Sequence, residues 1–182
     1  SSQALIADLD LDGYPESVFT IPKGIRIYKG TPEGPNNDLY DDVITNEDHF
    51  DLETFDINRD GYLDLLTAAA GSSIGIEDPD KTSFILLGSK NGFSASRSYD
   101  VLKSRGDQSA IGDVNNDGHL DILFHDKRNY ILIYLGSELA YSPDRVWKVP
   151  CHGMEDSAAP NLADINNDGW LDYISINFRE KL

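Results

Sequence analysis

Cysteine, positive charge and long apolar runs are all scarce in this sequence, and each shortage excludes a class of protein. Cys151 is the single cysteine among 182 residues, so no disulfide can form within the chain. We expect Cys151 to be a small buried residue rather than a nucleophile. No apolar run approaches the ~20 residues that cross a bilayer. The N-terminal end has no basic segment followed by an apolar one, so we expect a removed signal or a segment of a longer chain.

Positive charge is the second shortage. The chain has 15 lysines and arginines against 32 aspartates and glutamates, a formal net charge of -17. Nucleic acid is an unfavourable partner because phosphate binding requires clustered Lys and Arg, and anionic membrane surfaces are disfavoured for the same reason. The repulsion among so many acids would be relieved if they hold cations. Hydrophobic residues make up 40% of the chain, which is enough for a folded core.

One acidic string occurs four times. The copies are "DLDLDGYPE" (Asp8–Glu16), "DINRDGYLD" (Asp56–Asp64), "DVNNDGHLD" (Asp113–Asp121) and "DINNDGWLD" (Asp164–Asp172). Their starts lie 48, 57 and 51 residues apart, which indicates a module of about fifty residues. We divide the chain into approximate repeats 1–48, 49–105 and 106–156, with an incomplete repeat at 157–182. Residues 71–82 lengthen the second repeat and are expected to form an exposed loop.

Short β-prone runs surround each string. One run precedes it, a second follows it, and a third ends near a turn marked by Gly30, Gly88 or Gly136. A weaker strand is expected near Val43, at 99–102 and at 146–149, and no segment reads as a long amphipathic helix. Four short antiparallel strands per repeat are typical of a propeller blade. The sequence therefore predicts an all-β fold of about three and a half β-propeller blades, forming a single partial domain over residues 1–182.

The string has the composition of a loop that binds a hard cation. Side-chain oxygens fall at its first, third, fifth and ninth positions, and glycine at the sixth permits a sharp turn. Ca²⁺ prefers six to eight oxygen ligands, and the carbonyl of the seventh residue can add one more. The apolar second and eighth positions should anchor the loop in the core. Alternatively, the acids are only solvated turn residues. In that case they should not recur at the same positions in every repeat.

An EF-hand loop begins in the same way but requires an acid at its twelfth position. That position holds Phe19, Thr67, Phe124 and Ser175 here, and none of them can close the coordination sphere. The ion must instead be closed by the ninth residue, between two strands.

These strings resemble the calcium loops of FG-GAP/VCBS repeats, the blades of integrin-α-type and related bacterial β-propellers. The stretch "DINRDGYLDLLTAAAG" is similar to the family's D-x-[DN]-x-D-G-x-x-D-L-L-x-G-A-P, with three alanines where Gly-Ala-Pro is usual. The resemblance covers nearly the whole chain. It implies that each loop joins the first two strands of a blade and that up to four Ca²⁺ ions lie on one face. The implied ligands, the seventh residue through its carbonyl, are Asp8, Asp10, Asp12, Tyr14 and Glu16; Asp56, Asn58, Asp60, Tyr62 and Asp64; Asp113, Asn115, Asp117, His119 and Asp121; and Asp164, Asn166, Asp168, Trp170 and Asp172.

No catalytic constellation accompanies the loops. A Gly-x-Ser-x-Gly elbow is absent, the glycine-rich 71–75 lacks the Lys-Ser/Thr of a P-loop, and the four histidines have no zinc spacing. We expect a non-enzymatic, calcium-binding extracellular or cell-surface scaffold that binds protein or surface partners. The alternatives are a carbohydrate-binding module or an accessory part of a polysaccharide-processing enzyme. We expect further blades, from the parent chain or another subunit, to complete the ring. The triplet Arg105-Gly106-Asp107 spells RGD, an integrin-recognition sequence, and most such occurrences arise by chance.

Overall fold

The computed structural model describes residues 4–45, 49–69, 83–101, 108–126, 130–138, 141–142, 144–151 and 157–177. The expected loop at 71–82 and the RGD triplet at 105–107 lie outside the described residues. Within this part of the chain, no helix is long and apolar enough to cross a membrane.

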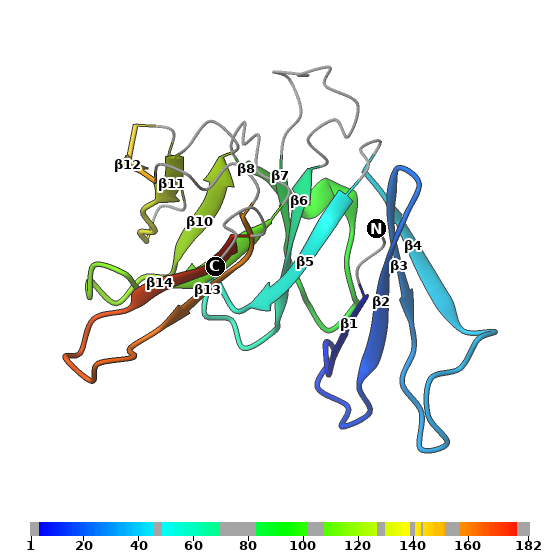
Figure 1. Ribbon diagram of the computed structural model, residues 1–182. Helices are drawn as coiled ribbons and strands as arrows, with labels where there is room; N and C mark the ends of the chain where they lie inside the picture. The colour runs from blue at the N-terminus through cyan, green and yellow to red at the C-terminus, as the bar shows by residue number, and fades with distance from the viewer. Residues whose placement is uncertain are drawn as a thin grey trace. The chain divides into compact units, whose positions relative to one another are not determined.

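The described residues form an all-β structure (Figure 1). Apart from one 3₁₀ turn, η1 (Ala95–Arg97), all regular structure in them is strand. The strands are β1 (Ala4–Ala7), β2 (Glu16–Ile21), β3 (Gly24–Tyr28), β4 (Tyr40–Ile44), β5 (His49–Phe55), β6 (Asp64–Ala69), β7 (Ser83–Leu86), β8 (Ser98–Val101), β9 (Ser109–Gly112), β10 (Asp121–Asp126), β11 (Tyr130–Tyr134), β12 (Val146–Pro150), β13 (Ser157–Ala163) and β14 (Asp172–Asn177).

The strands form four antiparallel sheets in which neighbours in sequence are neighbours in space. The first sheet is β1-β2-β3-β4, the second β5-β6-β7-β8, the third β9-β10-β11-β12, and the fourth β13-β14. Each sheet is a meander, the arrangement that short connections between alternating-pattern strands favour. The predicted weaker strands near Val43, at 99–102 and at 146–149 are confirmed as β4, β8 and β12.

The chain divides into two compact units, Ser1–Lys103 and Ser104–Leu182. The first unit contains the first and second sheets, and the second unit contains the third and fourth. Each unit has its own hydrophobic core.

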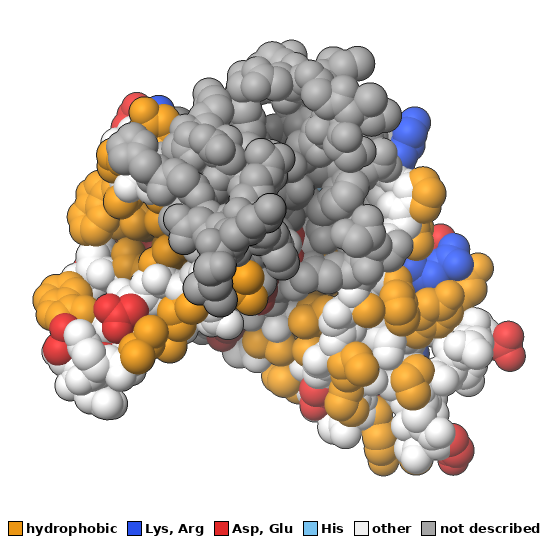
Figure 2. All heavy atoms as spheres, viewed as in Figure 1, with side chains coloured by type: hydrophobic (Ala, Val, Ile, Leu, Met, Phe, Trp, Pro, Cys, Tyr) orange, Lys and Arg blue, Asp and Glu red, His pale blue; other side chains and the backbone are white. Residues whose placement is uncertain are grey.

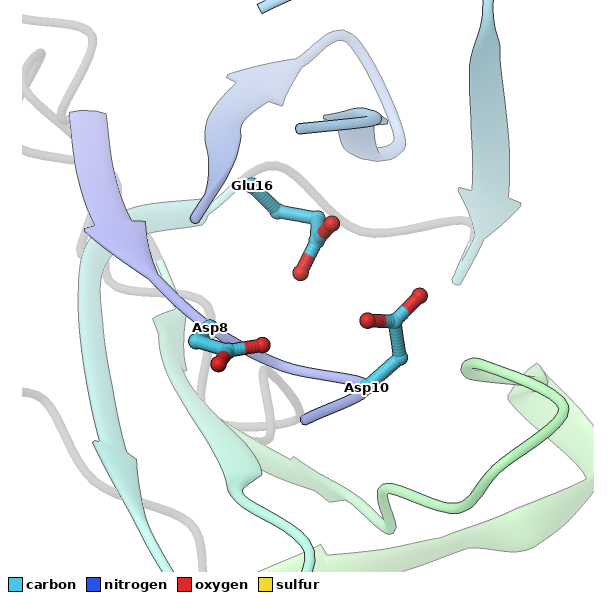
Figure 3. A group of neighbouring side chains, drawn as sticks. All are labelled: Asp8, Asp10 and Glu16. Atoms are coloured by element: carbon cyan, nitrogen blue, oxygen red, sulfur yellow. The ribbon is translucent and has the colours of Figure 1, made fainter. Parts of the chain in front are cut away.

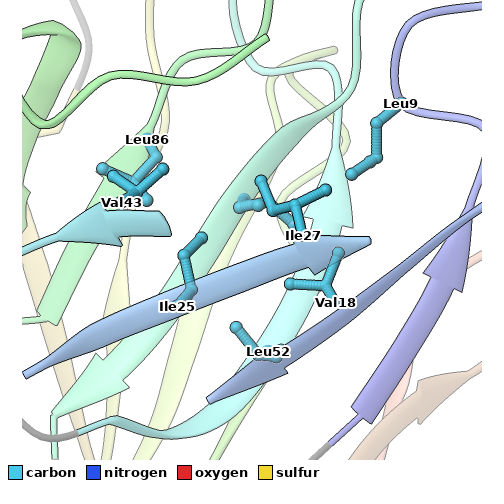
Figure 4. Packing of buried hydrophobic residues seen from close by; sticks show 8 residues of the cluster. Leu9, Val18, Ile25, Ile27, Val43, Leu52 and Leu86 are labelled. Atoms are coloured by element: carbon cyan, nitrogen blue, oxygen red, sulfur yellow. The ribbon is translucent and has the colours of Figure 1, made fainter. Parts of the chain in front are cut away.

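Alternation along the strands builds the core of the first unit (Figure 4). Val18 on β2 and Ile25 on β3 are fully buried, and they lie in one cluster with Leu52, Leu65 and Leu86 of the second sheet. Because successive side chains point to opposite faces of a strand, one face of the first sheet packs against the second sheet. Burial of a side chain of this size contributes about 1.5–3 kcal/mol.

The second unit is built in the same way. Leu123 and Ile133 of the third sheet lie in one cluster with Cys151, and Leu162 and Tyr173 of the fourth sheet pack against them. Cys151 is buried in this cluster, so the expectation of a small core residue is confirmed.

Two acids share one side of β5. Asp51 is buried, and Glu53 follows it two residues later. Burial disfavours the ionised carboxylate of Glu53, and the charge of Asp51 adds to this, so the pKa of Glu53 is raised to about 7. Since this pKa is above that of the unfolded chain, the stability contributed by Glu53 is complete below about 4.5 and is lost as the pH rises through about 7.

Replacement of Glu53 by Gln should remove this pH dependence. Glu53→Gln cannot ionise, so its melting temperature should exceed that of the wild type by a margin that grows between about pH 5 and pH 8. Near pH 8 we expect the free energy of unfolding of Glu53→Gln to exceed that of the wild type by about 1–2 kcal/mol. This figure is reduced because the side chain is partly exposed. Thermal unfolding across this pH range measures it, with Glu33→Gln on an exposed turn as the matched control. Parallel pH profiles for Glu53→Gln and wild type would contradict the argument.

Candidate metal centres

The four acidic strings occupy the same place in each sheet. Each string connects the first strand to the second, between β1 and β2, β5 and β6, β9 and β10, and β13 and β14. The ninth residue of each string is the first residue of the second strand: Glu16, Asp64, Asp121 and Asp172. The loop therefore ends, and the strand begins, at one acidic side chain.

The backbone of the four loops follows one conformation. The fourth residue has a φ of 63° at Leu11, 58° at Arg59, 56° at Asn116 and 58° at Asn167. The sixth residue, glycine in every loop, has a φ between 85° and 91°. A positive φ costs a residue with a Cβ roughly 1–2 kcal/mol and costs glycine almost nothing. The loops must recover that cost at the fourth position from their internal hydrogen bonds.

Those hydrogen bonds begin with the acid at the first position. Asp8 accepts from the backbone N–H groups of Asp12 at 3.1 Å and Gly13 at 3.0 Å. The same pair of bonds recurs at 3.1 and 2.9 Å in the second loop, 3.1 and 2.8 Å in the third, and 3.0 and 2.9 Å in the fourth. One carboxylate thus fixes the turn by satisfying two backbone donors.

The third and fifth positions continue the pattern. The third side chain accepts from the fifth N–H, as Asn58 does from Asp60 at 3.1 Å. The fifth side chain accepts from the seventh N–H, as Asp60 does from Tyr62 at 2.9 Å. Equivalent bonds are present in the other three loops. The side-chain oxygens of the first, third and fifth positions therefore have the same arrangement in all four loops. Acids that are only solvated turn residues would not share one arrangement.

The first loop brings three carboxylates together (Figure 3). Oxygens of Asp8, Asp10 and Glu16 all lie within 4.8 Å of one another. Two ligands of one Ca²⁺, each about 2.5 Å from the ion, can be at most about 5 Å apart. The donor set is all oxygen and all acidic. These residues therefore fit a hard divalent cation.

The other predicted ligands have equivalent hydrogen bonds within their loops, but among the described residues only Asp8, Asp10 and Glu16 bring three acidic oxygens within 4.8 Å of one another. In the second, third and fourth loops the third residue is asparagine, and its amide Nδ2 donates to the fifth aspartate at 3.0, 2.9 and 2.9 Å. Its Oδ1 stays directed into the loop, where it accepts the fifth N–H. That an ion is bound by the backbone carbonyls of the seventh residues stays a prediction; these residues are Tyr14, Tyr62, His119 and Trp170. Asn116 Nδ2 donates to the Gly169 carbonyl at 3.2 Å, so the third and fourth loops are neighbours.

The ninth residue connects the loop to the third strand of its sheet. Asp64 accepts from the backbone N–H of Ile57 at 2.8 Å through one oxygen and from that of Gly88 at 2.8 Å through the other. Asp121 does the same with Val114 at 2.9 Å and Gly136 at 2.8 Å. In the first sheet, Glu16 accepts from Leu9 at 2.8 Å and from Gly30 at 3.2 Å. Each carboxylate oxygen keeps a further lone pair for an ion.

The glycines that follow the third strands have a second purpose beside the one that their sequence indicated. We predicted that Gly30, Gly88 and Gly136 mark turns and that Gly34 and Gly92 reinforce two of them, and the positive φ angles of these connections belong to Gly34 and Gly92. A Cβ on Gly88 would lie 2.1 Å from the Leu63 carbonyl oxygen, and one on Gly136 would lie 2.2 Å from that of Leu120. Only glycine allows the third strand to approach the loop closely enough for its N–H to reach the ninth acid.

Burial affects the acids of the site unequally. Asp64 and Asp121 are fully buried, and burial raises the pKa of each carboxyl above its usual range despite two backbone donors. The exposed Asp117 has a lowered pKa, mainly because the His119 N–H donates to it. A basic side chain approaches two of the loops: Lys29 Nζ lies 3.7 Å from Asp10, and Arg145 lies 4.0 Å from Asp117. The sequence alone gave no signal for these two contacts.

The expected anchoring of the loops by their second residue is correct for three loops and wrong for the fourth. Leu9 is buried, and Ile57 and Val114 are half-buried, but Ile165 is 63% exposed. The fourth sheet has only two strands among the described residues, whereas the other three sheets have four.

The fold and the loops define an all-β repeat protein with one acidic loop in each sheet. The pattern of the FG-GAP-like repeat family matches residues 113–175, which include the third and fourth loops. The chain therefore carries an FG-GAP-like repeat, and the resemblance inferred from the sequence is confirmed over this stretch. A search of curated proteins found no match.

Gly88→Ala should destabilise the protein by about 2–3 kcal/mol, because its Cβ would meet the Leu63 carbonyl and displace the N–H that Asp64 accepts. Chemical denaturation measures the free energy of unfolding, and Lys90→Ala, on the exposed connection two residues later, is the control. An equal, small effect of both substitutions would show that the close approach does not matter.

Proposed function

We propose that this protein is a non-enzymatic, calcium-stabilised β-propeller scaffold. The observation that carries the proposal is the recurrence of one hydrogen-bonded loop in four sheets, with three acidic side chains of the first loop within 4.8 Å of one another. Four like-charged loops repel internally when no cation is bound. A divalent ion in each loop would remove that repulsion and add oxygen ligation, so binding to the folded state alone would stabilise it.

The proposed arrangement of the sheets is a propeller in which each sheet is one blade. Meanders of four strands, linked in chain order and packed face to face within each unit, support it. The FG-GAP-like repeat at residues 113–175 supports it as well. Further blades, from the parent chain or another subunit, would complete the ring.

The proposed location is extracellular or at a cell surface, where calcium is millimolar and weak loops of this kind are filled. A partner there would be a protein or a glycan-bearing surface. The net charge of -17 supports a role in which bound cations are part of the folded protein and disfavours nucleic acid.

Calcium should raise the melting temperature, and excess EGTA should lower it. Asp113→Asn removes one charge from the third loop, so isothermal titration should record one fewer equivalent of calcium and a smaller rise in melting temperature. Asp38→Asn makes the same change on an exposed turn and should behave as the wild type. A melting temperature that is the same in calcium and in EGTA would refute the proposal.

A second candidate, carbohydrate binding, is favoured by one pocket. Its volume is about 420 Å³, and it lies over the first sheet between Phe19, Arg26, Tyr28 and Asn37. Aromatic rings beside polar groups suit a sugar ring. The third sheet offers a counter-argument, because the equivalent pair Phe124 and Tyr134 has the same edge-on contact and is buried.

A glycan array probed with wild type and Tyr28→Ala separates the two candidates. Carbohydrate binding predicts a signal on specific glycans that Tyr28→Ala abolishes. The matched variant Trp147→Ala removes an exposed ring on β12, which is not part of the pocket lining, and should keep the signal. If the wild type gives no signal on any glycan, the carbohydrate candidate fails and the scaffold candidate remains.

A further inference from the structure

Positive charge is scarce on this protein, so a basic side chain that lies beside an acidic loop is informative. The chain has 15 lysines and arginines against 32 acids. Few of the basic side chains are in view in Figure 2, and these lie mainly over the first sheet, at the right. Two of them reach a loop. Lys29 Nζ lies 3.7 Å from Asp10 Oδ2 in the first loop, and an Arg145 nitrogen lies 4.0 Å from Asp117 Oδ2 in the third.

The main chain shows that these two cations belong to one recurring pair of positions. In each four-stranded sheet, the residue after the third strand donates its N–H to the carbonyl of the residue before the fourth strand. These bonds run from Lys29 to Leu39, from Leu87 to Arg97 and from Leu135 to Arg145, at 2.9, 2.9 and 3.0 Å. Every pair therefore consists of one leucine and one basic residue, and only the first sheet has them in the reverse order.

The second sheet separates the position of the cation from its contact with the loop. Arg97 has the same main-chain place as Arg145, and its guanidinium donates to the Gly92 carbonyl of its own connection. Lys29 and Arg145 are instead directed at an aspartate of the loop. Arg97 is therefore a control that the chain itself provides.

The surroundings of Lys29 allow its charge to leave the loop. Asp10 accepts the Asp12 N–H through Oδ1, and the lysine approaches the other oxygen, Oδ2. Lys29 Nζ also lies 3.9 Å from a carboxylate oxygen of Asp41 on β4. The ammonium group thus lies between two acids, and it can turn to Asp41 when a divalent ion takes Asp10.

A cation at this distance has two opposite effects on a loop. The first loop contains four acids and the third contains three, and like charges so close together repel one another. A basic side chain about 4 Å away offsets part of this repulsion while no ion is bound. The same side chain repels a divalent ion that enters the loop.

We propose that Lys29 and Arg145 are built-in counter-ions, which stabilise the empty first and third loops and lower the affinity of these loops for a divalent ion. The inference rests on the proposed function, in which the loops bind calcium. It adds that the calcium concentration at which these two loops fill is set by a side chain outside the acidic string.

A calcium titration of the whole 182-residue protein, followed by ¹H–¹⁵N NMR, measures each loop separately. The N–H of the sixth glycine donates to the first acid of its own loop, so Gly13 reports the first loop and Gly118 the third. Lys29→Leu introduces the residue that the second and third sheets have at this place. It should lower the calcium midpoint at Gly13 by at least about fivefold and leave Gly118 unchanged. Arg145→Leu should do the reverse.

Three further variants separate charge from packing. Lys29→Arg keeps the charge and should keep the wild-type midpoint at Gly13. Lys29→Leu combined with Leu39→Arg moves the cation to the place that it has in the third sheet, and should restore that midpoint. Arg97→Leu removes an equal charge from a side chain that donates to Gly92, and should leave the midpoint at Gly61 unchanged.

The effect on the empty loop is measured without calcium. In EGTA, the melting temperature of Lys29→Leu should rise more steeply with added sodium chloride than that of the wild type. Salt screens the acids of the first loop, which have lost their cation in this variant. Arg97→Leu should have the salt dependence of the wild type.

Equal calcium midpoints in the wild type, Lys29→Leu and Arg145→Leu would overturn the inference. So would a swapped variant that keeps the midpoint of Lys29→Leu, or parallel salt dependence of Lys29→Leu and wild type in EGTA. A wild type in which no sixth glycine responds to calcium gives a different result: it overturns the calcium proposal, and the effect on affinity with it.

Discussion

The buried carboxylate at the ninth loop position is the group on which each four-stranded sheet depends. Glu16, Asp64 and Asp121 are at most 1% exposed, and each accepts one backbone N–H from its loop and one from its third strand. A buried carboxylate is costly unless it is hydrogen-bonded and its charge is balanced. Two neutral donors satisfy its oxygens but leave its charge, which is why burial still raises the pKa of Asp64 and Asp121. A cation in the loop would complete the balance.

The hydrogen bonds of this acid explain the residue types at positions far from it in the sequence. The glycine after the third strand has no Cβ because the strand must approach the loop carbonyl, and its N–H then reaches the acid. The fourth residue and the sixth glycine, both with positive φ, make the turn that returns the chain to the second residue, whose N–H the acid accepts. Loop, second strand and third strand thus become one hydrogen-bonded unit, so a metal bound by the loop would stabilise the whole sheet.

The sequence was sufficient for the strands, for the loops between the first two strands of each sheet, and for the ninth residue as the point where the strand begins. These features depend on local spacing and period-two alternation. It was not sufficient for the bonds that Gly30, Gly88 and Gly136 donate to the ninth acids, because these partners lie 14 to 24 residues away and the sequence marked the glycines only as turn positions. The exposure of Ile165 was missed for a related reason: its loop has the usual pattern, and only the tertiary surroundings differ.

The four loops are not chemically equal, although they share a conformation. The first has an acid at all four side-chain positions and a glutamate at the ninth, while the others have asparagine at the third. The longer glutamate reaches Gly30 at 3.2 Å, against 2.8 Å for the aspartates, and its oxygen lies with those of Asp8 and Asp10. The same loop has Lys29 3.7 Å from Asp10, a cation that offsets the extra charge. A divalent ion of the kind proposed would be attracted most strongly by this loop, and it would have to compete with Lys29 for Asp10, so the two effects would oppose each other.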